Sequence, residues 1–181
     1  MKNIIFALLM LTVFTSCTKS QDINIKDWSV VRYYYSRGPL PPPYHYSFEI
    51  TVNNGGSSML NYYLGYDNNT PLVYNFTVST DDLKLLEEKI GNSNLASGKV
   101  ESMPENEHPI GGPLNKVKLI ITDPNPDLDQ PPKVFESPYF PKEEFKKNLQ
   151  ELYEFIEKLV PGDVWLDVGG KKTEYETNYK K

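Results

Sequence analysis

The sequence contains very little cysteine and histidine, and each shortage excludes a class of protein. Its single cysteine, Cys17, rules out an intramolecular disulfide and a cysteine-cluster metal site. The two histidines, His45 and His108, form no HExxH-type zinc motif, and GxSxG, P-loop and GxGxxG patterns are absent. There is no basic block, and 19 Lys and Arg face 24 Asp and Glu, so nucleic acid is not an expected partner. We therefore expect a protein that is not an enzyme and has no cofactor.

Only the first residues form a long apolar run. Met1–Asn3 carries one positive charge, and Ile4–Phe14 is apolar apart from Thr12. Spanning a bilayer takes about 20 residues, so this run is too short for a transmembrane helix. It is typical of a secretory signal peptide, which we place at residues 1–16.

The residues that follow this run resemble the lipobox of bacterial lipoprotein precursors. In Phe14-Thr15-Ser16-Cys17, the residues Ser16 and Cys17 match, Thr15 is acceptable, and Phe14 stands where Leu is usual. The resemblance implies cleavage before Cys17, a diacylglyceryl group on its sulfur and a fatty acid such as palmitate on its new amino terminus. It implies a membrane-anchored lipoprotein of the cell envelope, facing the periplasm or the cell surface. Residues 17–27 would then be a lipidated tether.

The mature chain begins with strand patterns. Tyr44–Val52 alternates apolar and polar residues, and the Asn53–Gly56 segment favours a tight hairpin turn. The sequence predicts four strands before the first helix: Trp28–Ser36, Tyr44–Val52, Met59–Tyr66 and Leu72–Val78.

Two helices and two more strands complete the predicted domain. A helix begins after Ser79, which can cap it, and an amphipathic helix follows Pro141, with strands at Val117–Thr122 and Lys133–Pro138 between them. The order β-β-β-β-α-β-β-α predicts an α+β fold: a single two-layer domain, in which two helices pack on one face of an antiparallel sheet. We place it at residues 28–168, expect residues 169–181 to be a flexible tail, and expect a monomer.

Clustered tyrosines are the first candidate binding feature. Neighbours in a strand point to opposite faces, so some rings of Tyr33, Tyr34, Tyr62 and Tyr63 should lie on the face that the helices leave open. Such rings could form a platform for a glycan or a protein. The alternative is that they only reflect β propensity and cross-strand packing.

A proline-rich segment is the second candidate. Gly38–Pro43 favours a stiff polyproline II loop between two strands, with Arg37, Pro41 and Pro42 as possible contacts for a partner. The alternative is a stiff connector without a binding role.

An acidic segment offers a weak metal candidate. Asp123, Asn125, Asp127 and Asp129 alternate as in the start of a calcium loop. However, Leu128 stands where such a loop has Gly, and Val134 where it has Glu. A solvated acidic turn is the simpler interpretation, and we expect no metal.

The order of elements resembles emfourin-type domains, which inhibit thermolysin-like metalloproteases. The similar parts are Tyr35-Ser36-Arg37-Gly38, Phe76-Thr77-Val78-Ser79 and the last amphipathic helix. The proline-rich loop and the long 92–113 segment depart from that pattern, so no inhibitory residue is carried over. The sequence therefore predicts a non-catalytic binding module with an unidentified protein or glycan partner. Protease inhibition and glycan binding are the alternatives.

Overall fold

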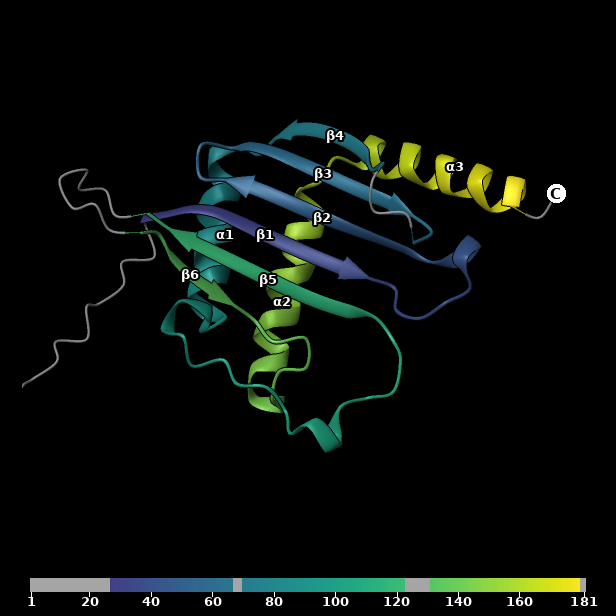
Figure 1. Cartoon of the computed structure of the whole chain (residues 1–181). Coiled ribbons are helices and arrows are strands. Elements are labelled where there is room, and N and C mark those ends of the chain that lie inside the picture. The colour runs from purple at the N-terminus through teal and green to yellow at the C-terminus, as the bar shows by residue number, and fades with distance from the viewer. Residues whose placement is uncertain (1–26, 67–69, 123–130, 180–181) are drawn as a thin grey trace, which may run out of the picture.

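The computed structural model describes residues 27–66, 70–122 and 131–179. It contains one six-stranded sheet in which every neighbouring pair of strands is antiparallel. The spatial order of the strands is β4-β3-β2-β1-β5-β6 (Figure 1). Their bounds are β1 Trp28–Ser36, β2 Tyr46–Asn53, β3 Ser57–Leu64, β4 Leu72–Thr77, β5 Leu114–Ile121 and β6 Lys133–Glu136.

The register follows from the alternation of the sequence. Val31, Tyr33 and Tyr35 of β1 lie opposite Val52, Ile50 and Phe48 of β2, so apolar residues meet on one face. β5 pairs with the other side of β1, and Tyr35 lies opposite Asn115. The chain therefore places its first strand at the centre of the sheet and buries it between two partners.

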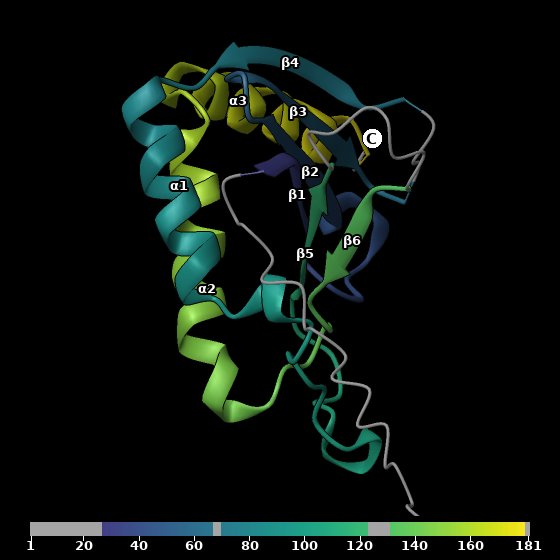
Figure 2. The ribbon, with the colours of Figure 1, turned by 90° about the vertical axis from the view of Figure 1, so that its left-hand side faces the viewer.

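Three helices pack on the same face of the sheet: α1 Thr80–Asn92, α2 Glu143–Leu159 and α3 Gly162–Tyr179. Figures 1 and 2 show α1 and α2 side by side behind the strands, and α3 beside β3 and β4. Ser79 caps α1 by accepting a hydrogen bond from the backbone N–H of Asp82 at 3.1 Å. The α+β prediction is confirmed, with a sheet on one side and helices on the other.

The core lies between these layers. Phe48 of β2 is 4% exposed, and Leu152 of α2 is fully buried in the same cluster. Side chains of β1, β2, β3 and β5 pack there against α1 and α2. No helix within the described residues is long and apolar enough to cross a membrane.

The C-terminal segment differs from the expected loose tail. The sequence predicts a flexible segment from residue 169, but α3 continues to Tyr179. Val168 is buried, and the hydroxyl of Tyr74 in β4 donates to Asp167 at 2.6 Å. The helical layer therefore has three members instead of two, and the third one borders the site described below.

The β1–β2 connection also differs from the expected projecting polyproline loop. Pro42–Tyr44 form a 3-10 turn, and the Tyr66 hydroxyl donates to the Leu40 carbonyl at 2.7 Å. Gly38 has φ +90°, and a Cβ at this position would lie 2.1 Å from the carbonyl oxygen of Gly112. The loop is therefore held against the segment that enters β5.

Candidate functional site

Two neighbouring cavities lie at one end of the sheet, where β1 and β3 end and β2 and β5 begin. The aromatic cavity, of about 480 Å³, lies between the sheet and α3; it is lined by Tyr35, Tyr46, Phe48, Tyr62, Glu157, Trp165, Val168, Gly169 and Lys172. The loop cavity, of about 400 Å³, is lined by Tyr35, Arg37, Pro39, Leu40 and residues 111–113. Tyr35 lines both, so the two cavities are neighbours.

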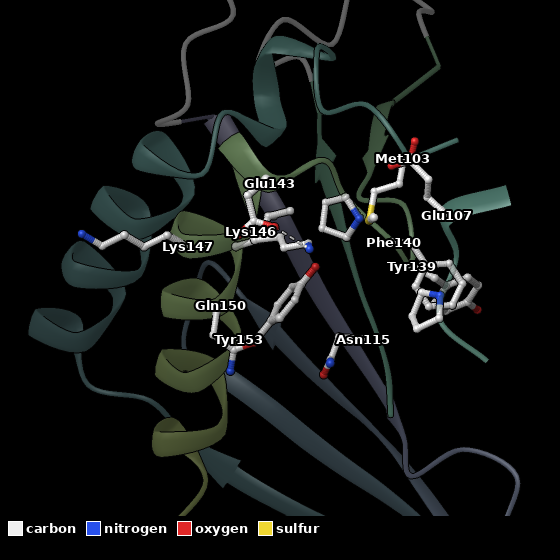
Figure 3. Close-up of a pocket in the computed structure, with 13 residues that line it drawn as sticks. Met103, Glu107, Asn115, Tyr139, Phe140, Glu143, Lys146, Lys147, Gln150 and Tyr153 are labelled. Atoms are coloured by element: carbon white, nitrogen blue, oxygen red, sulfur yellow. Dashed lines mark hydrogen bonds and ion pairs between the residues drawn. The ribbon is translucent and has the colours of Figure 1, made fainter. Parts of the chain in front are cut away.

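The third cavity, of about 580 Å³, lies along the N-terminal half of α2. Figure 3 shows Gln150 and Tyr153 projecting from α2, with Phe140, Tyr139 and Met103 across from them. Its charged residues include Glu143 and Lys146, which pair with each other at 2.7 Å on the same helix. The lining of this α2 cavity therefore combines apolar and aromatic side chains with four charged ones.

The Tyr33 hydroxyl stands between the α2 cavity and the aromatic cavity. Its Oη lies 2.6 Å from Asn115 Oδ1, in the α2 cavity, and 2.8 Å from Glu157 Oε1, in the aromatic cavity. One hydroxyl hydrogen can serve only one of two oxygen acceptors. The second contact needs a proton on Glu157, or an Asn115 amide turned so that its NH₂ donates. Burial raises the pKa of the Glu157 carboxyl, which favours the first arrangement.

The tyrosines of the aromatic cavity stack on one another. Tyr35 and Phe48 have ring centroids 4.9 Å apart with planes at 17°, and Tyr46 and Tyr62 have centroids 5.4 Å apart at 16°. Burial, followed by the neighbouring Tyr46 hydroxyl, raises the pKa of Tyr35 to about 12. Burial likewise raises the pKa of Tyr62. These phenols stay protonated at neutral pH and can donate hydrogen bonds to a ligand.

Two cations flank the ring of Tyr46. The Arg37 guanidinium lies 5.5 Å and the Lys172 ammonium 5.1 Å from its centroid. Lys172 pairs with Glu176 of α3 at 3.0 Å. Arg37 is one of only two arginines in the chain. No carboxylate in the described part of the chain forms an ion pair with it.

The four candidate tyrosines divide between the two faces of the sheet, as their alternation predicts. Tyr33 and Tyr62 face the helices and are 1% and 3% exposed, so they belong to the core and the cavity floor. Tyr34 and Tyr63 lie on the open face, because they alternate with those residues along β1 and β3. Only this second pair could contribute to an open-face surface.

The open face carries a small hollow of about 150 Å³, lined by Arg32, Tyr34, Glu49, Lys116, Lys118 and Glu136. Glu136 pairs with both Lys116 and Lys118, and these bonds lower the pKa of its carboxyl. Three of the five charged side chains of this hollow therefore already form ion pairs with one another. The open face leaves few charged groups free to bind a ligand.

The remaining candidate positions have separate outcomes. Arg37 lines the loop cavity, while Pro41 and Pro42 are exposed beside it and line none of the three cavities. The acidic candidates Asp123, Asn125, Asp127 and Asp129 lie outside the described residues. Within residues 27–66, 70–122 and 131–179, no group of three or more His, Cys, Asp and Glu could hold a metal ion.

Three residues that line the aromatic cavity were not among the predicted site residues: Glu157, Trp165 and Lys172. Glu157 looked like one of many charges on the outer face of α2, and the other two lie in a segment that has no amphipathic pattern. Trp165 meets Phe48 edge-on with centroids 5.4 Å apart, and its Nε1 donates to the Glu157 carbonyl at 3.2 Å. The tryptophan itself was the only signal, since a large ring in a polar segment indicates a tertiary contact.

No protein-family model matches the chain, and no match was found among curated proteins.

Proposed function

We propose that this protein is a lipid-anchored protein of the cell envelope whose α+β domain binds a small ligand in the aromatic cavity without transforming it. The lipobox at Cys17 supports the anchor. The observation that carries the binding role is the aromatic cavity itself, a concave site with an apolar floor and a few polar groups. Ligand sites in proteins have this composition and occupy about 300–1,000 Å³.

The chemistry of the lining supports binding rather than catalysis. Burial raises the pKa of the Glu157 carboxyl, yet Glu157 is the one carboxylate in the described lining of this cavity. Glycoside hydrolysis needs a pair of carboxylates, and acyl transfer needs a nucleophile beside a base. The phenols have pKa values raised by burial, so they are poor nucleophiles and suited to donating hydrogen bonds.

The placement of the cavity also supports this role. The chain enters the sheet at Trp28, while the cavity lies at the other end of β1, beside Tyr35. The nine residues of β1 separate these ends by about 27 Å, at about 3.4 Å per residue. A domain tethered through its N-terminal segment would therefore present the cavity away from the membrane.

The test blocks the cavity with a side chain. A Cβ on Gly169 or Gly170 meets nothing within 4 Å, but only Gly169 lines the cavity. We expect Gly169→Phe to abolish ligand binding and the matched Gly170→Phe to preserve it. The full chain in detergent micelles would be screened by thermal shift against saccharides, peptides and metabolites, with mass spectrometry to show that the bound compound is unchanged.

Two results would contradict the proposal. One is that no compound stabilises the native chain, or that Gly169→Phe binds every hit as well as Gly170→Phe does. The other is conversion of a bound compound to a product, which would indicate an enzyme.

A further inference from the structure

The polar groups of the aromatic cavity can both donate and accept hydrogen bonds. Tyr35, Tyr46 and Tyr62 bring three hydroxyls, Lys172 an ammonium group and Glu157 a carboxyl group. A hydroxyl is both donor and acceptor, so this lining suits a ligand that itself carries many hydroxyls. Lys172 and Glu157 already have Glu176 and Tyr33 as partners, but a purely apolar ligand would not engage the tyrosine hydroxyls, and a buried polar group left without a partner costs binding energy.

Apolar surface is interleaved with these polar groups. Phe48, Trp165 and Val168 contribute carbon surface to the same cavity, and Gly169 leaves its mouth without a side chain. A pyranose ring has the matching character, with C–H groups on its faces and hydroxyls around its rim. Because Tyr35 lines the loop cavity as well, a ligand can extend past it with a second sugar unit.

Arg37 determines the charge of such a ligand. Its guanidinium lines the loop cavity, lies over the Tyr46 ring and has no carboxylate partner within the described residues. A guanidinium presents donors in a planar fork that fits a carboxylate. A cationic ligand is disfavoured, because Arg37 and Lys172 already lie close to the face it would use.

We propose that the ligand is an acidic oligosaccharide, with one sugar in the aromatic cavity and a carboxylate of the next sugar at Arg37 in the loop cavity. This inference rests on the function proposed above and names the ligand class of that site. It also places the glycan-binding site on the helical side of the sheet, whereas the sequence analysis considered one on the open face.

Isothermal titration of the full chain in detergent micelles tests the ligand class. The probes are tetrasaccharides of galacturonic, glucuronic and mannuronic acid, each paired with its counterpart in which the carboxyls have been reduced to alcohols. We expect at least one acidic tetrasaccharide to bind, and its reduced counterpart to bind at least about tenfold more weakly. Added salt should weaken binding of the acidic form alone.

Two pairs of variants test whether Arg37 and Tyr35 contribute to binding. Arg37→Gln should lower the affinity for the acidic probe to that for the reduced one, while Arg32→Gln, on the open face, should change neither. Tyr35→Leu should weaken both probes at least about tenfold, whereas its neighbour Tyr34→Leu should bind as the native chain does. Tyr35→Phe, which keeps the ring and removes the hydroxyl, separates the contribution of the ring from that of the hydroxyl.

The outcomes separate this inference from the proposed function. Equal binding of acidic and reduced probes, or an unchanged affinity in Arg37→Gln, overturns the acidic ligand. Binding that depends on Tyr34 and not on Tyr35 would return the site to the open face. If only peptides or metabolites show binding sensitive to Gly169→Phe, the saccharide is wrong and the cavity stands. If nothing does, both proposals fail.

Discussion

The environment of Glu157 in the structure differs from the one that its position in the sequence predicts. In the sequence it is one charge on an amphipathic helix, and in the structure it is half-buried and bonded to the Tyr33 hydroxyl. Burial raises the pKa of its carboxyl, and the hydrogen bond from Tyr33 lowers it by less. The folded state therefore holds a proton at Glu157 more tightly than the unfolded state does.

This shift predicts a pH-dependent stability. A carboxyl whose folded-state pKa is raised stabilises the fold below its unfolded pKa, and that contribution is lost as the pH rises through the folded-state value. Glu157→Gln removes the ionisation, so the variant should gain stability relative to the native chain as the pH rises from the unfolded-state pKa of Glu157 through its raised folded-state pKa. The gain should stay below about 1 kcal/mol, because solvent screens a half-exposed group.

Urea unfolding between pH 4 and pH 8 measures this difference. Glu174→Gln, which changes an exposed glutamate of α3, is the control and should follow the native profile. Parallel profiles for Glu157→Gln and the native chain would contradict a raised pKa at this position.

At the scale of elements, α3 is the part that the site depends on most. Its sequence carries Gly169 and Gly170 in mid-helix, where each glycine disfavours a helix by about 1 kcal/mol relative to alanine. The helix is held from outside instead: Trp165 packs on Phe48, Asp167 accepts from Tyr74, and Val168 is buried. Tertiary contacts, rather than local helix propensity, therefore stabilise α3, which forms one wall of the aromatic cavity.

Two adjacent residues of α3 test this account. Trp165→Ala should lower the free energy of unfolding by about 2–4 kcal/mol, because it removes a large packed ring. Leu166→Ala should change it by no more than about 0.5 kcal/mol, since Leu166 is 78% exposed. Denaturation of both variants in urea gives the values. Equal effects would mean that α3 does not pack on the sheet through Trp165.

The strands were easier to predict than this helix. The bounds of β1 and the first residue of β4 agree with the sequence-based expectation, because alternation and turn residues are local signals. The burial of Tyr33 and Tyr62 was not predictable to the same degree. Alternation shows that Tyr33 and Tyr34 face opposite ways, but it does not say which of the two faces the helices.

At the scale of the whole molecule, the start of β1, which follows the proposed tether, and the aromatic and loop cavities lie at opposite ends of the sheet. Residues 17–27 would form a tether of eleven residues before β1. Two or more acyl chains on Cys17 would hold the protein stably at a membrane, since one chain alone binds only marginally. The domain would then be attached at one end and open to ligands at the other.

Replacement of Cys17 tests the anchor. Cys17→Ser should abolish labelling with an alkyne fatty acid and move the protein out of the membrane fraction or leave an uncleaved precursor, because serine offers no sulfur for the lipid. Thr18→Ser, the neighbouring control, should be labelled as the native chain is. Labelling that persists in Cys17→Ser would refute the lipoprotein assignment.

Local patterns in the amino-acid sequence are enough to predict the fold class, the strands and two of the helices. Those features depend on alternation, helical periodicity, caps and turn residues, all of which act within a few residues of one another. Packing between distant segments was needed for three further features: α3 forms, Tyr35 and Tyr62 line a cavity while Tyr34 and Tyr63 lie outside it, and Glu157 meets Tyr33. These contacts join residues up to 124 positions apart, and no local pattern encodes a contact that exists only when the sheet and helices pack together.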